Sequence, residues 1–359
     1  TWDSRTQKVC CQMKIVLAGA GSAGHIEPAL AVADAWRKEF PQSEFEFVGT
    51  TTGLENILVT GAGYKLTTIP KVTLPRSLKP TGLLAPLKFG QALAKSLQIV
   101  NGAECVIGFG GYVSAPIYLA AAMRRIPFVI HEANAIPGWA NKFGAFLGGA
   151  MAVGKLVKTG KFKAAEVVGL PLKPAISAAL DMAKSNWPAA RSSAKAKLGI
   201  KADKPLLLIM GGSQGSAAIN SVVASSLSNL LSDFEILHSV GGKNQLPLAR
   251  DGYRPVSYIE DVATAYLAAD LVIGRSGAIT CAEINALGKY AIFIPLAIGN
   301  GEQARNADFL IEQGRAALVQ QSDFSAQWLI KNLSSALAKS QGFMAGNESD
   351  RDAAANIVK

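Results

Sequence analysis

The sequence predicts an α/β protein with two Rossmann-like parallel-sheet domains that face a cleft. At 359 residues the chain is long for a single domain. Strand-like and helix-like segments alternate along it, and such alternation is typical of parallel sheets covered by helices. Each half also begins with a buried strand that enters a glycine-rich turn, "KIVLAGAGSAG" in the first half and "PLLLIMGGSQG" in the second. Two such cycles predict two domains.

The first half is expected to build the first sheet. Its strand-like runs are "KIVLAG", "FEFVGT", "CVIGFGG" and "IPFVIHE". Helices are expected through "PALAVADAWRKEF" and near residues 114–123. We treat the polar residues 1–12, which precede Met13, as an extension outside this domain. The first domain is therefore predicted to span residues 13–172.

The second half repeats the pattern and is predicted to form a domain over residues 173–340. Residues 173–204 are rich in Lys, Ala and Ser and are expected to form a linker and an exposed helix. The strand-like runs that follow are "PLLLIM", "FEILHSV", "LVIGRSG" and "YAIFIPL". Helices are expected near 217–231 and from residue 279. Residues 341–359 form a tail.

Composition excludes several classes of protein. The chain is 49% hydrophobic and 17% charged, as is usual for a globular protein. Its four Cys and three His residues have neither metal-ligand spacing nor a disulfide pattern, so we expect no metal site and a reducing cytoplasm. Residues 105–123 carry no charge, but glycines and a proline interrupt them. A strand, a loop and a helix explain this run better than a membrane span.

The positive charge is concentrated in the first half. Residues 13–172 hold 16 Lys and Arg against 9 Asp and Glu, a net of +7, whereas residues 173–359 hold 18 against 16, a net of +2. Between Glu55 and Glu104 there are six cations and no carboxylate. This asymmetry predicts a polyanionic partner for the first domain: an anionic membrane, a diphosphate or a nucleic acid.

The first glycine-rich turn matches the sequence motif of a dinucleotide-binding site, Gly19-x-Gly21-x-x-Gly24. A dinucleotide fold also needs an acidic residue at the end of the second strand, to bind the ribose. Here that strand ends in Gly49 and Thr50. The turn therefore favours a helix N-terminus that receives a diphosphate or a sugar acceptor. His25 follows on the first helical turn and is either functional or a half-buried polar cap.

The second half supplies a better candidate for ribose binding. "GRSGAITCAEINALG" places Glu283 on the helix after a glycine turn, where its carboxylate can accept two ribose hydroxyls or simply face solvent. The loop "IGNGEQARNA" follows the next strand, and its amides suit hydrogen bonding to a sugar. Neither a phosphate-binding GxxxxGK[ST] loop nor a Ser-His-Asp pattern is readable.

Several ordered blocks together resemble the MurG family of glycosyltransferases, from about Met13 to at least residue 315. The blocks are "GSAGHIEPALAVA", "GFGGYVSAP", "HEANAIPGWANK", "VVGLPLK", "GGSQGS", "YIEDVATAYLAADLVIGRSGAITCAEINALG" and "GNGEQARNA". The resemblance implies the GT-B architecture and an inverting, metal-independent reaction. N-acetylglucosamine would pass from UDP-N-acetylglucosamine to the 4-hydroxyl of lipid-linked muramyl-pentapeptide (lipid I to lipid II). The site would be the cytoplasmic face of the plasma membrane, where the enzyme is peripheral.

The resemblance also assigns roles to residues by position. On the donor side, Ile259 would contact uracil through its backbone, Glu283 the ribose and Gln303 the sugar hydroxyls. Ser213 and the turn of Ala278, Ile279 and Thr280 would hold the diphosphate, and Asn134 would reach the donor sugar from the first domain. On the acceptor side the resemblance places Ser22, His25 and Tyr112, and the turn Ser22, Ala23 and Gly24 is also a candidate for donor contacts. The tail 341–359 would pack back on the first domain.

Some positions depart from the family pattern. The family's first turn is usually GGTGGH, so Ala20 and Ala23 stand where it has glycine, and their methyl groups crowd a close approach of backbone to ligand. Lys173 stands where the family commonly has Arg. The lysine keeps the positive charge but cannot make the bidentate hydrogen bonds of a guanidinium. Glu302 stands where many members have Gln. None of these changes removes an obviously essential group.

Three hypotheses follow for the mechanism and the partners. His25 is the candidate base or acceptor-positioning residue, and helix N-termini aided by Lys173 would offset the diphosphate charge without a metal or cofactor. Residues 74–100 form either an ordinary helix with a basic edge or a patch that docks on anionic membrane. The membrane residues are Arg76, Lys79, Leu83, Leu84, Leu87 and Lys88.

Other functions remain open at this point. An NAD-dependent oxidoreductase would explain the first turn alone, and a UDP-N-acetylglucosamine 2-epimerase would share the fold but need no lipid acceptor. A non-catalytic nucleotide- or lipid-binding protein would give no product. No nucleic-acid partner is expected.

Overall fold

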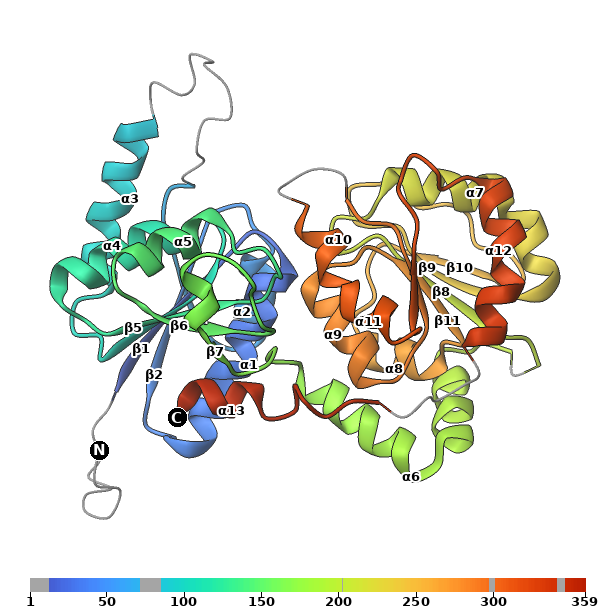
Figure 1. Cartoon of the computed structure of the whole chain (residues 1–359), viewed down its shortest axis with the longest axis horizontal. Helices are drawn as coiled ribbons and strands as arrows, with labels where there is room; N and C mark the ends of the chain where they lie inside the picture. Colours follow the sequence, from blue (N-terminus) through green and yellow to red (C-terminus); the bar gives the residue numbers. More distant parts are fainter. Residues whose placement is uncertain (1–12, 72–84, 202, 297–300, 341–345) are drawn as a thin grey trace. The chain divides into compact units, whose positions relative to one another are not determined.

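The structure is a computed structural model that describes residues 13–71, 85–201, 203–296, 301–340 and 346–359 (Figure 1). Contacts along the backbone divide the chain into two compact units. Unit 1 contains the chain up to Glu132 together with residues 137–171 and 352–359. Unit 2 contains residues 133–136 and 172–351. The chain therefore passes between the units more than once.

The sheet of unit 1 is parallel and has the Rossmann strand order. Its described strands lie in the order β3-β2-β1-β4-β5-β6-β7, and every printed pairing is parallel. The order reverses between β1 and β4, which is where α/β sheets bind their ligands. The strands are β1 (Lys14–Gly19), β2 (Glu44–Gly49), β3 (Lys65–Thr68), β4 (Cys105–Gly110), β5 (Phe128–Glu132), β6 (Ala150–Val153) and β7 (Glu166–Val167).

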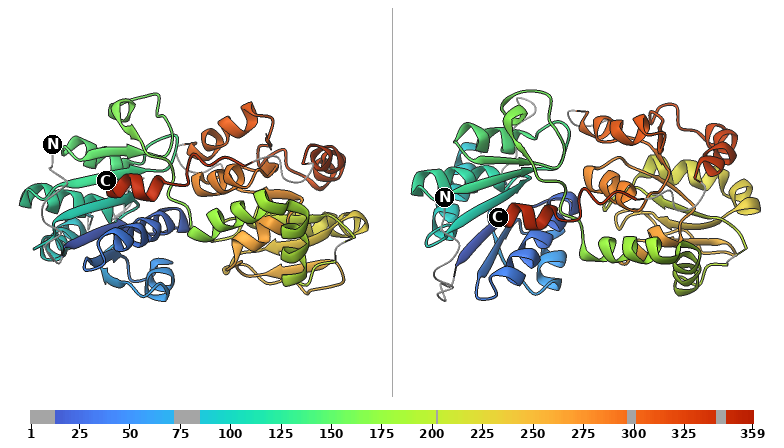
Figure 2. Two further views of the ribbon diagram at one scale, coloured as in Figure 1. Left: turned by 90° about the horizontal axis from the view of Figure 1, so that it is seen from below. Right: turned by 60° about the horizontal axis from the view of Figure 1, so that its bottom comes forward.

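Two helical layers cover this sheet. One apolar cluster joins α3 (Ala85–Ile99), α4 (Ser114–Arg124) and α5 (Trp139–Phe146) to one face. The other cluster joins α1 (Ala23–Glu39) and α13 (Ala353–Val358) to the opposite face. Figure 2 shows α13 lying along α1, and contacts between the two helices agree. The short elements α2 (Glu55–Gly61) and η2 (Lys161–Ala164) complete the unit.

Unit 2 repeats the same strand order, β10-β9-β8-β11-β12-β13, with a reversal between β8 and β11. Alternate side chains of β8 enter different cores: Leu206 and Leu208 join one apolar cluster, Leu207 and Ile209 the other. The predicted fold class, two Rossmann-like parallel-sheet domains, is thus confirmed. The strands are β8 (Leu206–Met210), β9 (Glu235–Ser239), β10 (Tyr253–Val256), β11 (Leu271–Gly274), β12 (Ala291–Phe293) and β13 (Ala316–Leu318).

The helices of unit 2 also lie on both faces. One face carries α6 (Pro174–Lys197), α8 (Val262–Ala268), α9 (Ala278–Ala286) and α11 (Asp308–Glu312), and the other carries α7 (Ala217–Asp233) and α12 (Ala326–Lys339). α10 (Glu302–Asn306) precedes α11. The expected linker and exposed helix is in fact one kinked helix, α6, which buries Ile176 and Leu180. Its non-helical residue is Asn186, two positions before Pro188.

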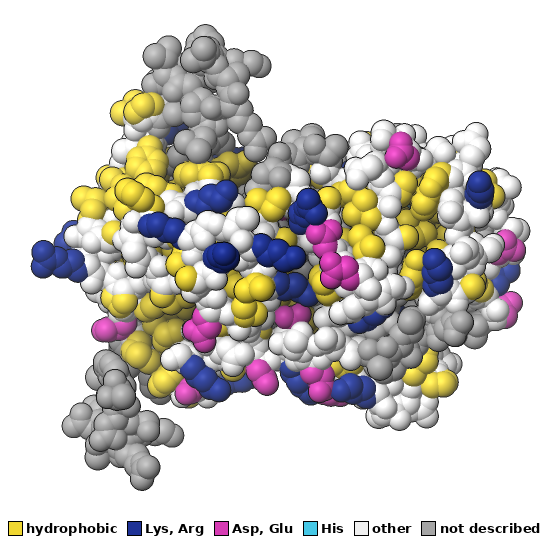
Figure 3. Space-filling model, viewed as in Figure 1, with side chains coloured by type: hydrophobic (Ala, Val, Ile, Leu, Met, Phe, Trp, Pro, Cys, Tyr) yellow, Lys and Arg dark blue, Asp and Glu magenta, His cyan; other side chains and the backbone are white. Residues whose placement is uncertain are grey.

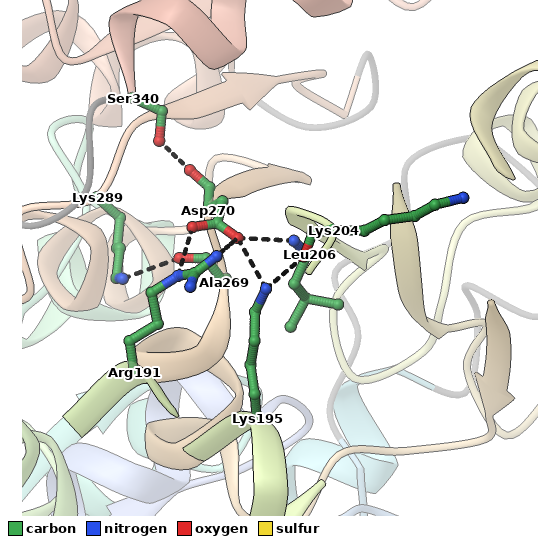
Figure 4. A network of polar contacts seen from close by, with 8 residues as sticks. All are labelled: Arg191, Lys195, Lys204, Leu206, Ala269, Asp270, Lys289 and Ser340. Atoms are coloured by element: carbon green, nitrogen blue, oxygen red, sulfur yellow. Dashed lines mark hydrogen bonds and ion pairs between the residues drawn. The ribbon is translucent and has the colours of Figure 1, made fainter. Parts of the chain in front are cut away.

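A buried ionic network ties α6 to the sheet (Figure 4). Asp270, just before β11, accepts hydrogen bonds from the Arg191 guanidinium at 2.7 and 2.6 Å and from the Leu206 N–H at 2.7 Å. The Lys195 ammonium, which is 1% exposed, lies 3.4 Å from the same carboxylate. Lys289 donates to the Ala269 carbonyl at 2.9 Å. One carboxylate therefore pairs with two cations at the start of β11, and a third, Lys289, binds the neighbouring backbone carbonyl.

Candidate functional site

The first glycine-rich turn joins β1 to α1 at the reversal point of unit 1. Ser22 is extended at the N-cap position, and its carbonyl accepts the N–H groups of His25 and Ile26. A Cβ on Gly19 would lie 2.6 Å from the His25 carbonyl oxygen, so the helix approaches the strand closely here. Within this turn only Gly21 has positive φ, at 93°. Ala20 is buried and does not have positive φ, so the turn accepts alanine there.

His25 is held in a defined orientation by this turn. Its Nδ1 lies 3.1 Å from the Ala20 carbonyl oxygen and 3.3 Å from Ser22 Oγ. A carbonyl oxygen can only accept, so Nδ1 carries the hydrogen, and in the neutral ring Nε2 has the free lone pair. Nε2 points at the second glycine turn, where a Cβ on Gly110 would lie 3.3 Å away. The geometry therefore presents a proton acceptor beside Gly110.

Glu55 is a buried acid beside the first glycine-rich turn that the sequence analysis missed. The acid that is absent from the end of β2 stands at the start of α2, fully buried, and turns toward the first glycine-rich turn. Its carboxylate accepts the Gly21 N–H at 3.1 Å and the Thr50 N–H at 2.7 Å. Burial acts to raise the pKa of Glu55, but these hydrogen bonds outweigh burial and hold the pKa below its usual value. The Gly21 N–H therefore already donates its hydrogen bond to a carboxylate of the protein.

The hydrogen bond between Glu55 and Gly21 bears on the prediction that the N-terminus of α1 binds a ligand. We expected the helix N-terminus to receive a diphosphate or a sugar acceptor, and the Gly21 N–H already binds an anion from the chain itself. The signal in the sequence was the spacing of Gly53 and Glu55, since a Cβ on Gly53 would lie 2.0 Å from Glu55 Oε2. Only glycine fits at that position.

A second buried carboxylate orders the loop after β5. Glu132 accepts the Gly138 N–H at 2.9 Å and an N–H of the Asn141 side-chain amide at 3.0 Å, and so ties the residue before α5 to a side chain of that helix. Tyr118 donates to the other end of the Asn141 amide, at 3.0 Å. Neither Glu132 nor Asn141 was among the predicted site residues. Tyr112, which was, lies partly exposed on the turn after β4, with the Lys71 ammonium 4.8 Å from its ring centre.

The corresponding turn of unit 2 lies between β8 and α7. Ser213 is partly exposed in this turn, and Ser216 caps α7 by accepting the Ile219 N–H. The Arg275 guanidinium, at the end of β11, donates to Ser216 Oγ at 2.8 Å and to the Ile294 carbonyl at 2.9 Å. Arg275 was also missed in the sequence. It links the glycine turn after β8 to the end of β12.

The N-terminus of α9 is open to solvent beside this turn. Its N-cap residue is Gly277, so no side chain at that position binds the first N–H groups of the helix. The first helical residues, Ala278, Ile279 and Thr280, are partly exposed. The first N–H groups of a helix have no partner within the helix, so this end can bind an anion. Glu283 lies on the next turn, 7% exposed, and accepts a 3.0 Å hydrogen bond from the Tyr266 hydroxyl.

The other predicted donor residues lie on separate segments that belong to unit 2. Ile259 is partly buried against the core after β10, and Lys173 immediately precedes α6. Gln303 uses its side-chain oxygen to accept the Leu296 N–H at 2.9 Å. Asn134 belongs to the short segment 133–136 that packs with unit 2. Asn306, a residue that we missed, donates to Asn134 Oδ1 at 3.2 Å and accepts the Ala135 N–H at 2.9 Å.

The described residues show no metal-ligand cluster and no helix long and apolar enough to cross a membrane. Within those ranges no three His, Cys, Asp or Glu side chains gather as around a metal ion. None of the described helices has the length and hydropathy of a membrane span.

Comparison with protein families shows which class of protein the chain belongs to. Residues 15–152 match the glycosyltransferase family 28 N-terminal domain, and residues 206–359 match the glycosyltransferase family 28 C-terminal domain. The chain belongs to glycosyltransferase family 28. It is therefore a glycosyltransferase, and the NAD-dependent oxidoreductase considered above is not favoured.

Curated relatives of this family-28 glycosyltransferase share one name. A protein of Corynebacterium efficiens is 44% identical over 89% of this chain and 87% of its own length, and one of Streptomyces coelicolor is 42% identical over 91% and 90%. Both are named UDP-N-acetylglucosamine--N-acetylmuramyl-(pentapeptide) pyrophosphoryl-undecaprenol N-acetylglucosamine transferase.

Solved structures agree with the family. The crystal structure of Acinetobacter baumannii MurG is 27% identical, has a TM-score of 0.68 and covers 96% of this chain and 98% of its own. The Streptomyces glycosyltransferase SsfS6, at 17% identity and a TM-score of 0.61, covers 96% of this chain and 98% of its own and shares the fold.

Proposed function

We propose that this family-28 glycosyltransferase transfers N-acetylglucosamine from UDP-N-acetylglucosamine to the 4-hydroxyl of lipid-linked muramyl-pentapeptide, converting lipid I to lipid II. The named activity of relatives at 42–44% identity supports the substrates. The observation that carries the proposal is the open N-terminus of α9 with the Glu283 carboxylate on its next turn. A nucleoside diphosphate has both groups that this arrangement would bind, an anion and a sugar diol.

The donor binds to unit 2 in this proposal. The diphosphate lies against the N–H groups of Ala278, Ile279 and Thr280, with Ser213 on the neighbouring turn. The helix dipole and the Lys173 ammonium offset the charge that develops on the diphosphate, without a metal ion. Glu283 accepts the ribose hydroxyls, the Ile259 backbone contacts uracil, and Gln303 and Asn134 contact the sugar.

The acceptor binds to unit 1, beside the two glycine-rich turns. His25 Nε2 accepts the proton of the muramyl 4-hydroxyl while that oxygen attacks C1 of N-acetylglucosamine. The bond from C1 to the diphosphate oxygen breaks at the same time, and UDP leaves with the electron pair. Attack from the opposite side inverts the configuration at C1. Ser22 and Tyr112 contact the acceptor.

Product formation tests this proposal. Incubation with labelled UDP-N-acetylglucosamine and a synthetic lipid-linked muramyl-peptide is expected to give the lipid-linked disaccharide and UDP. A 2-epimerase would instead change the donor without an acceptor, and a binding protein would give no product; either result would contradict the proposal. UDP at a hundred times its Kd should add about 2.7 kcal/mol to the free energy of unfolding and so raise the melting temperature. NAD should not change either quantity.

We also propose that unit 1 docks on the anionic cytoplasmic surface of the membrane. Of the residues predicted for this patch, Arg76, Lys79, Leu83 and Leu84 lie outside the described residues. Leu87, 61% exposed, and Lys88 lie in the first turn of α3. Phe146 at the end of α5 is 72% exposed, with the Lys161 ammonium 5.5 Å from its ring centre. Figure 3 shows hydrophobic side chains gathered with basic ones over this part of unit 1.

Vesicle binding tests the membrane proposal. Binding is expected to need anionic lipid and to weaken with salt, since each basic residue near such a surface contributes about 1 kcal/mol. Leu87→Glu is expected to weaken binding about tenfold, because it removes an apolar contact and adds a repelled charge. Leu248→Glu, at an 87% exposed leucine of unit 2, is the matched control and should leave binding unchanged. Equal effects of the two variants, or binding that salt does not weaken, would contradict the proposal.

A further inference from the structure

A buried tyrosine lies directly behind the carboxylate of Glu283. Tyr266 on α8 is 0% exposed, and its hydroxyl donates to Glu283 Oε2 at 3.0 Å. Glu283 itself is 7% exposed and lies on α9, one turn after the open N-terminus. Two helices therefore meet through one hydrogen bond at the position that would face a ribose.

The tyrosine keeps its proton in this environment. Burial, and after it the neighbouring charge of Glu283, raise the pKa of Tyr266 well above its usual value. The hydroxyl is therefore a permanent hydrogen-bond donor to the Glu283 carboxylate. An ionised carboxylate only accepts hydrogen bonds, and it has about four lone-pair positions. It can accept from Tyr266 and still accept from a ligand.

The position of Tyr266 is fixed by its helix. The N-cap of α8 is Asp261, which accepts the Thr264 N–H at 3.1 Å, and the Lys197 ammonium of α6 lies 2.6 Å from the same carboxylate group. α8 packs along α6. The Tyr266 ring belongs to the main apolar cluster on this face of the sheet. The hydroxyl therefore reaches Glu283 from a rigid element.

We propose that Tyr266 is a positioning residue that makes the donor site selective for a ribonucleotide over its 2′-deoxy analogue. This inference rests on the proposed role of Glu283 as the acceptor of ribose hydroxyls. The terminal torsion of a glutamate side chain is broad, so an unheld carboxylate can rotate. With one oxygen held by Tyr266, the plane of the carboxylate is set, and its acceptors face two adjacent hydroxyl donors. A 2′-deoxyribose supplies one donor fewer to this nearly buried carboxylate, and sites built to bind a hydroxyl reject the analogue that lacks it.

Calorimetric binding of UDP and 2′-deoxy-UDP tests the inference, with three variants beside the unmodified protein. The unmodified protein is expected to bind UDP at least tenfold more tightly than 2′-deoxy-UDP. Tyr266→Phe should weaken UDP about tenfold and change 2′-deoxy-UDP little, so that the selectivity ratio falls about tenfold. Tyr290→Phe, which removes the hydroxyl of another buried tyrosine of unit 2, is the matched control and should keep the ratio.

The third variant, Glu283→Gln, separates the two proposals. If Glu283→Gln leaves the affinity for UDP unchanged, Glu283 does not bind the ribose and the proposed donor site is wrong. If Glu283→Gln lowers the ratio but Tyr266→Phe does not, the donor site stands and the positioning role of Tyr266 is overturned. A general loss of stability in Tyr266→Phe would lower the affinity for UDP and for 2′-deoxy-UDP equally. That outcome would also contradict the proposed role of Tyr266 in selectivity.

Discussion

His25→Ala is expected to lower kcat by about 10²–10⁴, the usual contribution of a positioned general base. The structure gives the reason: the Ala20 carbonyl accepts from Nδ1, so the neutral ring presents Nε2 as the proton acceptor. Alanine removes the acceptor but leaves the backbone of the turn, which is held by the Ser22 carbonyl. Steady-state kinetics with varied acceptor concentration would measure the change.

The same experiment separates a base from a residue that only binds the acceptor. A pure binding role would raise the KM for the acceptor and leave kcat nearly unchanged. A base lowers kcat and kcat/KM together. Near-normal turnover with unchanged acceptor affinity in His25→Ala would show that the assignment is wrong. His25→Gln, which can still donate to the Ala20 carbonyl through its amide, should lose as much turnover as His25→Ala.

Asp270→Ala is expected to lower the free energy of unfolding by about 3–5 kcal/mol, because it leaves a buried ammonium and a partly buried guanidinium without their carboxylate. Arg191 and Lys195 both lose their ion-pair partner, and the Leu206 N–H loses its acceptor. Urea unfolding at pH 7 would measure the loss. Asp251→Ala is the control: it breaks an exposed pair with Lys201 and should change stability little.

The loss should also depend on pH. Burial acts to raise the pKa of Asp270, but the bonds from Arg191 and Leu206 and the charge of Lys195 outweigh it and lower the pKa. A carboxyl group whose pKa is lower in the folded state stabilises the protein above its unfolded pKa, near 3.9. That stabilisation disappears as the pH falls through the folded pKa. The difference between the two proteins should therefore be full at pH 7 and shrink below about pH 4; a difference independent of pH would contradict this account.

Local features of the fold could be predicted because they depend on neighbouring residues. The strand and glycine turn of "PLLLIMGGSQG" and the helix that carries Glu283 follow from apolar runs and the glycines that end them. α6 was misjudged because its Lys, Ala and Ser composition resembles that of a linker. Its apolar positions, such as Ile176 and Leu180, bury one side of the helix in the core of unit 2.

The parts of the site that were missed depend on contacts between distant positions. Glu55 binds the N–H of a residue 34 positions earlier, and Arg275 bonds a serine 59 positions earlier. Tyr266 and Glu283 are 17 residues apart on different helices. Spacing along the chain shows which residue types follow a strand, but it does not show which distant atoms they meet. Pairing across the sheet brings these groups together.

The place of α13 has a consequence for synthesis of the protein. Ala353 and Ile357 are buried against the face of unit 1 that carries α1, yet residues 172–351 of unit 2 separate them from the rest of that unit. On the ribosome, the apolar surface that α13 covers must wait until the whole of unit 2 has been translated. At about 5–20 residues per second this delay is on the order of 10–40 seconds. During that time the apolar surface under α13 stays uncovered on the nascent first unit.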